Sequence, residues 1–241
     1  MADFFNPHVA DPFVMFSAVH LLCVALLIVA AAAMYAFRRT IRESPPLRDG
    51  IRFLLIGMLL VPELTLYGWY TSERLWDLQY SLPLELCSMS LLLSIVMLFT
   101  RSRRLYEILY FAGIGGAMMA MLTPNLLYPF PHFRFFHFFI AHIAIILAPL
   151  YMTWVEQYRP TWRSLGTAML FLNVLLVIVG TADYVLEANY MFLRHKPGTP
   201  SILDVLGPYP YYLLVEELIA FAVFVLMLLP FVWPRRAKPV A

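Results

Sequence analysis

Long, continuous apolar runs constrain this chain more than any other feature of its sequence. Seven stretches approach or exceed the roughly 20 mainly apolar residues that a membrane-spanning helix needs. They cover residues 12–37, 51–72, 82–100, 105–124, 133–155, 165–189 and 208–233. Apolar and polar residues do not alternate in these runs, so barrel strands are not expected. The sequence predicts an all-α, polytopic membrane bundle of seven transmembrane helices that forms one domain over residues 1–241.

The composition excludes several other classes of protein. Hydrophobic residues make up 62% of the chain and charged residues 13%, whereas soluble domains average about 45–50% and about 25%. A water-soluble globule is therefore excluded, and nucleic acid is not an expected partner because no dense basic patch exists. The cysteines, Cys23 and Cys87, both lie in apolar runs, which excludes a disulfide scaffold.

Lys and Arg predict the orientation, because cytoplasmic connectors of membrane proteins are enriched in them. Alternate connectors and the carboxyl-terminal tail carry most of these residues: Arg38, Arg39, Arg42, Arg48, Arg52, Arg101, Arg103, Arg104, Arg159, Arg163, Arg235, Arg236 and Lys238. The opposite side carries Arg74, Arg134, Arg194 and Lys196. We therefore expect the amino terminus outside and the carboxyl terminus inside.

Polar residues of the predicted spans gather at one depth. They are His20, Glu63, Glu85, Cys87, His137, His142, Asp183, Glu187, Glu216 and Glu217. At about 1.5 Å per residue, all lie within roughly 3–14 Å of the outer boundary. Polar contacts that only join helices have no reason to avoid the inner half. The pattern therefore favours a polar cavity open to the outside, although interhelical contacts remain the alternative.

Cys87 and His142 are the strongest candidates for chemistry in this cavity. A thiol becomes a nucleophile when an adjacent base removes its proton, and His142 lies at a comparable depth on another span. Asp183 or Glu216 would orient the imidazole, and Tyr190 or Asn189 would stabilise an oxyanion.

Two rival functions use the same cavity. A metal-dependent hydrolase could take ligands from His20, Glu63, His142 and Glu216, but no paired histidine spacing supports a metal site. A small-solute transporter or binding protein would need polar residues through the inner half, which the sequence lacks. No lysine lies within a span, so a retinal Schiff base is excluded. No cofactor is expected.

Several segments together resemble a known family. They are Pro83-Leu84-x-Leu86-Cys87, His142, Asn189-Tyr190-Met191-x-Leu193, Lys196-Pro197, and Ser201-x-Leu203-Asp204-x-Leu206-Gly207-Pro208-x-Pro210-x-Tyr212. Over nearly the whole chain this pattern resembles the YwaF-like integral membrane proteins of bacteria. Those proteins are similar to eukaryotic transmembrane acyltransferases that remodel ether phospholipids through a Cys and a His. They more distantly resemble androgen-induced membrane hydrolases of fatty-acid esters.

The resemblance implies a role for two residues and a class of partner. Cys87 would be the acyl-accepting thiol and His142 the base. The partners would be membrane lipids, with a phospholipid acyl donor and a lysolipid acceptor, and the location the bacterial cytoplasmic membrane. Family members often carry a His where this chain has Glu85.

Overall fold

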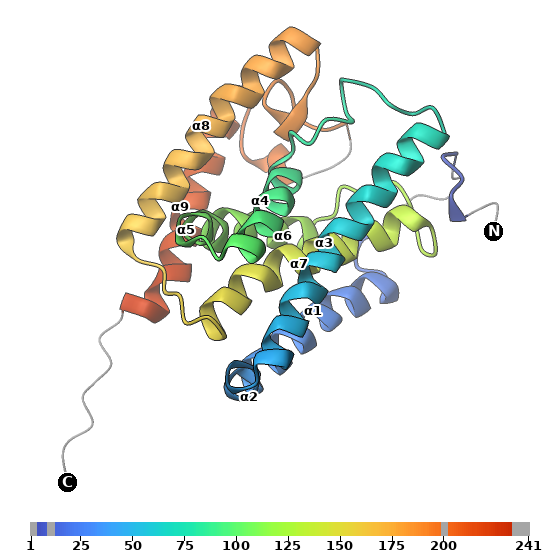
Figure 1. Ribbon diagram of the computed structural model, residues 1–241. Coiled ribbons are helices and arrows are strands. Elements are labelled where there is room, and N and C mark those ends of the chain that lie inside the picture. The colour runs from blue at the N-terminus through green and yellow to red at the C-terminus, as the bar shows by residue number, and fades with distance from the viewer. Residues whose placement is uncertain (1–3, 9–12, 199–201, 233–241) are drawn as a thin grey trace.

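Every regular element of the computed structural model is helical within the residues it describes, which are 4–8, 13–198 and 202–232 (Figure 1). The α-helices are α1 (Ala18–Ala36), α2 (Arg38–Glu43), α3 (Pro45–Ser72), α4 (Leu86–Thr100), α5 (Arg103–Ile108), α6 (Ile114–Leu122), α7 (Phe133–Trp154), α8 (Trp162–Leu186) and α9 (Tyr211–Val232). A π-helical segment, η2 (Leu109–Gly113), joins α5 to α6, and short 3-10 turns, η3 (Tyr190–Phe192) and η4 (Ile202–Val205), follow α8.

Each predicted span contains a helix, but their lengths differ. Within the described residues, six helices are long and apolar enough to cross a membrane, counting Arg103–Leu122 as one. The exception is α4, which has 15 residues where the sequence predicted a span over 82–100. The segment from Leu82 to Glu85 is not helical, because the ring of Pro83 restricts the residue before it and removes a donor. Trp233 and the basic tail residues Arg235, Arg236 and Lys238 lie outside the described residues, as do Pro12 and Ser201.

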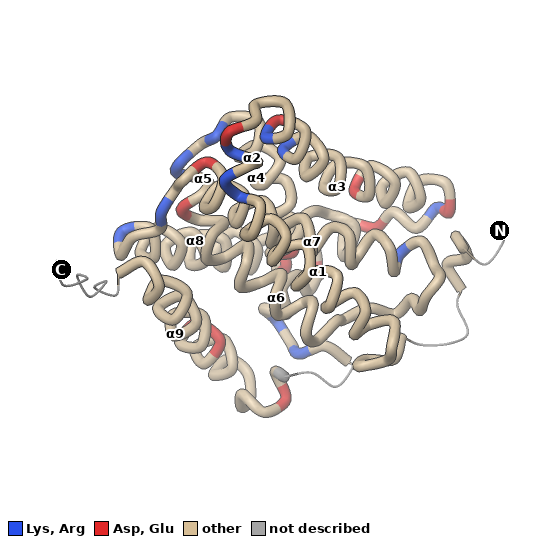
Figure 2. The backbone as a smooth tube through the Cα atoms, turned by 90° about the horizontal axis from the view of Figure 1, so that it is seen from below, with Lys and Arg blue, Asp and Glu red and all other residues tan. Residues whose placement is uncertain are grey.

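Successive long helices run in opposite directions between two ends of the bundle. We call one the basic end; it holds α2, the start of α5 and the start of α8, where Lys and Arg gather (Figure 2). Here Asp49 accepts from Arg101 at 3.3 Å and pairs with Arg52 at 3.4 Å. We call the other the connector end; it holds the connectors 73–85, 123–132 and 187–210.

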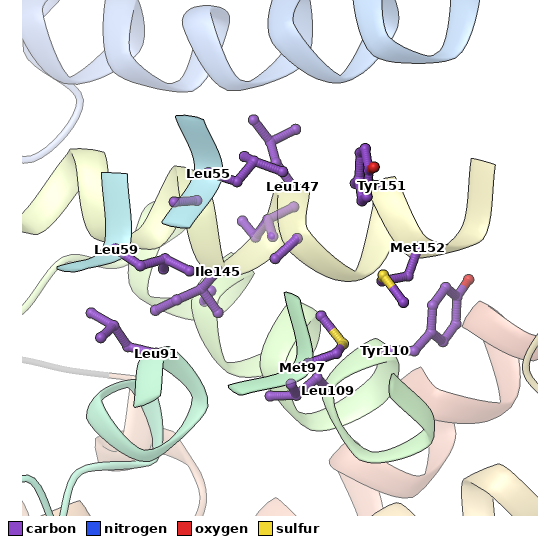
Figure 3. Packing of buried hydrophobic residues seen from close by; sticks show 14 of the residues in the cluster. Leu55, Leu59, Leu91, Met97, Leu109, Tyr110, Ile145, Leu147, Tyr151 and Met152 are labelled. Atoms are coloured by element: carbon purple, nitrogen blue, oxygen red, sulfur yellow. The ribbon is translucent and has the colours of Figure 1, made fainter. Parts of the chain in front are cut away.

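Helix α7 is the centre of the bundle and packs against α1, α3, α4 and α6. Its small residues Ala141, Ala144 and Ala148 are buried, which lets neighbouring helices approach closely. Toward the basic end, apolar side chains from several helices close the interior, as Figure 3 shows for Leu59, Met97 and Met152. The scarcity of ionisable residues in the inner half of the predicted spans is thus matched by apolar packing.

The first turn of α4 rests on α6. A Cβ at Gly116 would lie 3.0 Å from Leu86 Cδ2, so the missing side chain at Gly116 permits the contact. All five residues of η2 are buried immediately before α6. Because Leu86 precedes Cys87, this contact fixes the position of the candidate thiol.

Candidate functional site

Cys87 is the second residue of α4 and is half-buried. The N-cap residue Glu85 makes no side-chain cap, and Met89 N to Glu85 O at 3.0 Å is the first backbone bond of the helix. The backbone N–H groups of the first turn therefore have no partner within the helix. The positive end of the α4 helix dipole therefore lies beside Cys87.

His142 is buried on α7, and its tautomer follows from its surroundings. Its Nδ1 donates to the carbonyl oxygen of Phe138 at 2.6 Å, since a carbonyl can only accept. The neutral ring therefore carries its lone pair on Nε2. The Phe138 ring also contacts the imidazole, with 4.2 Å between the ring centroids. His142 is held in an orientation in which Nε2 can accept a proton.

Cys87 and His142 lie on two helices, α4 and α7, that are in contact. Leu91 follows Cys87 by one turn, and Ile145 follows His142 by nearly one turn; both are in the same buried cluster (Figure 3). Both helices run from the connector end to the basic end, so each candidate lies about one turn nearer the connector end than its apolar neighbour. Among the described residues no hydrogen bond joins them, so the pair stays a prediction.

Two predicted acids hold the connector that follows α8. Asp183, fully buried, accepts from the N–H of Tyr190 at 2.8 Å through Oδ1. Glu85 accepts from the N–H of Met191 at 3.1 Å. Met191 has a φ of 54° and Phe192 one of 55°, in the left-handed region that L residues seldom adopt. The acids thus stabilise an unfavourable turn.

Tyr190 joins the same turn to the connector before α4. Its hydroxyl donates to the carbonyl oxygen of Leu78 at 2.9 Å and accepts from the N–H of Leu82 at 2.9 Å. Burial raises the pKa of Tyr190, with Glu85 and Asp183 adding to the effect and the Leu82 N–H opposing it, so the hydroxyl keeps its proton at neutral pH. Neither of its donors is free for an oxyanion.

Asn189 is likewise occupied by the connector. Its Oδ1 accepts from the N–H groups of Arg194 and His195, each at 3.1 Å, and its Nδ2 donates to the His195 carbonyl oxygen at 2.9 Å. The side chain of Asn189 therefore shapes the loop, and its hydrogen-bonding groups are engaged there.

Glu63 and His137 form a second polar group, between α3 and α7. Arg134 donates to His137 Nδ1 at 3.3 Å, so the opposite ring nitrogen, Nε2, donates to Glu63 at 3.4 Å. The imidazole links the cation to the buried carboxylate.

His20 is also fully used: its Nδ1 accepts from Phe16 N at 2.9 Å and its Nε2 donates to Met121 O at 2.8 Å. Glu216 lies half-buried on α9, whereas its neighbour Glu217 accepts from Asn173 at 2.6 Å. No three or more His, Cys, Asp and Glu side chains are grouped to hold a metal ion in the part of the chain described here. The ligand set proposed for a metal-dependent hydrolase is therefore not assembled.

A cavity of about 480 Å³ opens at the connector end. Three predicted residues line it: Glu85, Asn189 and Tyr190. Sequence reasoning did not select Arg134, His195 and Tyr80, which line it as well. Tyr80 and His195 lie in connectors and Arg134 in the first turn of α7, so their convergence depends on how the connectors fold against α7.

Six helices of the described residues are long and apolar enough to cross a membrane, which defines a multi-pass α-helical membrane protein. The chain belongs to the TMEM164 family, a family of transmembrane proteins, which it matches over residues 15–228. The comparison with curated proteins finds no match, and neither does the comparison with solved structures.

Proposed function

We propose that this protein is a lipid-directed acyltransferase or ester hydrolase that uses Cys87 as nucleophile and His142 as base. The observation that supports the proposal is the contact between α4, whose first turn carries the thiol, and α7, on which His142 presents a lone pair on Nε2. The resemblance to transmembrane acyltransferases with a catalytic Cys and His supports the same pair.

The reaction follows from these two groups. His142 Nε2 takes the thiol proton, and the sulfur attacks the carbonyl carbon of a lipid ester. The ester C–O bond breaks, a thioester forms on Cys87, and the leaving alkoxide takes the proton from the imidazolium. A lysolipid hydroxyl then attacks the thioester while His142 accepts its proton, which releases the acylated lipid and restores the thiol. Water in place of the lysolipid gives hydrolysis.

The first turn of α4 supplies donors for the developing oxyanion. The backbone N–H groups of this turn have no partner within the helix and lie next to Cys87. Preorganised donors of this kind contribute much of the transition-state stabilisation in acyl transfer. They take the role that the sequence suggested for Tyr190 or Asn189, whose donors are engaged elsewhere.

The polar cavity fits the headgroup of the lipid substrate. Glu85 lines it and stands two residues before Cys87, so a headgroup there brings the ester bonds of the same lipid toward the thiol. Asp183 and Glu85 act by holding the connector that forms one wall.

The proposed topology has seven crossings, with the amino terminus outside and the carboxyl terminus inside the bacterial cytoplasmic membrane. In this topology α4 completes its crossing with the non-helical residues that precede it. The basic end would face the cytoplasm, in keeping with the preference of Lys and Arg for cytoplasmic connectors (Figure 2).

The test is to trap the thioester. Purified full-length protein in detergent micelles receives a short-chain phosphatidylcholine, and intact mass measures an acyl adduct that hydroxylamine removes. We expect the adduct in the wild type and in Cys23→Ala, which alters the other, buried cysteine. Cys87→Ala should give none, and His142→Gln should slow its formation by about 10²–10⁴-fold. An adduct that persists in Cys87→Ala, or that is lost equally in Cys23→Ala, would contradict the proposal.

A further inference from the structure

A second cavity lies on the lateral face between α8 and α9. It has a volume of about 370 Å³ and is lined by Leu176, Gly180, Tyr184, Leu193, Arg194, Tyr209 and Leu213. Leu176, Gly180 and Tyr184 are spaced by four residues, so they lie along one face of α8. We call this cavity the α8–α9 groove.

The groove has a definite floor and an open mouth. Asn173 donates to Glu217 at 2.6 Å, and this bond joins α8 to α9 about one turn below the groove, on the side of the basic end. Gly180 creates the space above it, since a Cβ there would meet only Leu193 Cδ1, at 3.9 Å. The mouth lies at the connector end, where both helices leave the apolar part of the bundle.

Arg194 stands at this mouth with donors to spare. Its Nη1 donates to the carbonyl oxygens of Asp183 and Ala188, each at 3.3 Å, which fixes the guanidinium over the carboxyl-terminal end of α8. Its Nε and Nη2 make no hydrogen bond to the described residues, and no carboxylate among these residues lies within ion-pair distance. The side chain is exposed.

We propose that the α8–α9 groove binds one acyl chain of an anionic phospholipid whose phosphate is held by Arg194. The occupant must be apolar where Leu176, Leu193 and Leu213 line the groove and anionic at its mouth. A guanidinium with two adjacent free N–H groups matches phosphate oxygens in a bidentate arrangement. A phospholipid has both features, an apolar chain and an anionic phosphate, and its phosphate lies at the membrane interface next to the apolar layer. This lipid site is independent of the proposed acyl transfer, because it needs neither Cys87 nor His142.

Binding is measured by native mass spectrometry of the full-length protein in dodecyl maltoside, which contains no phosphate. The probes are phosphatidylglycerol, diacylglycerol with the same chains, and inorganic phosphate. We expect one phosphatidylglycerol to be retained in preference to diacylglycerol, with no retention of inorganic phosphate alone. Equal retention of diacylglycerol, or binding of free phosphate without lipid, overturns the proposal.

Two substitutions address the two parts of the site. Arg194→Gln should lower phosphatidylglycerol retention by about tenfold, the value of one charge-assisted hydrogen bond, while Arg194→Lys should retain part of it. Gly180→Leu should fill the groove and also abolish retention. Gly166→Leu is the matched control, since Gly166 lies on the same helix with nothing within 4 Å of its added Cβ.

The outcomes separate a lipid site from its alternatives. Unchanged retention in both Arg194→Gln and Gly180→Leu refutes the site. A wild-type dimer that Gly180→Leu dissociates, without any change in bound lipid, assigns the groove to a second copy of the chain and also refutes it. Loss of retention in Gly166→Leu would show that the effect of Gly180→Leu is not local. Thioester formation at Cys87 is scored separately, so either proposal can fail alone.

Discussion

Asp183 Oδ1 accepts the main-chain N–H of Tyr190 at 2.8 Å, from a carboxylate with no exposed surface. The bond fixes the entry to the turn at Met191, whose backbone is left-handed. Asp183, a candidate functional acid in the sequence, therefore also stabilises the structure where α8 ends and its connector begins.

Asp183→Ala should destabilise the protein by about 1–3 kcal/mol, because the buried Tyr190 N–H loses its acceptor. Asp183→Asn keeps an oxygen at Oδ1 and should cost less than about 1 kcal/mol. Unfolding in detergent, followed by circular dichroism, measures both. If Asn proves as damaging as Ala, the charge of Asp183 matters and the hydrogen bond does not.

Gly116→Leu should destabilise the bundle by about 1–3 kcal/mol and impair acyl transfer, because the new side chain pushes Leu86 and the first turn of α4 away from α6. The control is Gly57→Leu, at a helical glycine on α3 with nothing within 4 Å of its added Cβ. A loss of activity that is the same in both variants would show that the α4–α6 contact does not position Cys87.

The apolar runs predicted the positions of the helices well, since lipid and core both demand apolar side chains. Helix α4 is shorter than the predicted span because hydropathy counts Leu82 and Leu84 as apolar. It does not take into account the backbone restriction at Pro83. Depth alone also grouped Asp183 and Glu85 correctly at one end of the bundle.

Individual roles within the polar cluster could not be predicted. His20 and Met121 are joined by a hydrogen bond although they lie 101 residues apart, and such a pairing depends on packing. The side chain of Asn189 is engaged by its own loop, donating to His195 and accepting from Arg194, and this pairing depends on how the turn folds. From the sequence, only the charge of Arg194 and its predicted side of the membrane could be derived. Its position at the α8–α9 groove depends on the fold.

His132 should make the stability of the protein depend on pH. Its Nδ1 accepts the N–H of Arg134 at 3.1 Å and its Nε2 donates to Asn6 O at 3.1 Å. Burial lowers its pKa below 6.5, with Arg134 adding to the effect and the Asn6 bond opposing it. As the pH falls, the His132 side chain of the unfolded protein is thus protonated before that of the folded protein. The contribution of His132 to stability is therefore fully present above pH 6.5 and decreases as the pH drops below it.

His132→Asn provides the comparison for this pH effect. Asparagine accepts the Arg134 N–H as a helix N-cap but does not titrate. Melting temperatures of wild type and variant should therefore diverge as the pH falls from about 7.5 to about 5.5, the wild type losing more. Parallel curves would assign the acid sensitivity to other groups.

The proposed topology predicts a pattern of cysteine labelling. In a cysteine-free background on intact cells, a membrane-impermeant maleimide should label Leu78→Cys and Leu127→Cys, both exposed at the connector end. It should reach Glu43→Cys and Arg104→Cys only after permeabilisation. Labelling of Arg104→Cys together with Leu78→Cys would mean that α4 does not cross, and the reverse pattern would invert the protein.

The π-helical segment Leu109–Gly113 has a consequence for how this chain tolerates deletion and insertion. A π-turn carries one residue more than the α-helical path over the same rise. Deleting a single residue there would restore a regular helix and leave the residues after it on nearly the same faces, because the wide π-turn absorbs the extra residue. Gly116 would then still face Leu86, whereas a deletion in the regular helix α6 before Gly116 would turn it away by about 100°. The π-turn is thus the place in this helix where the contact between α6 and the start of α4 tolerates the loss of one residue.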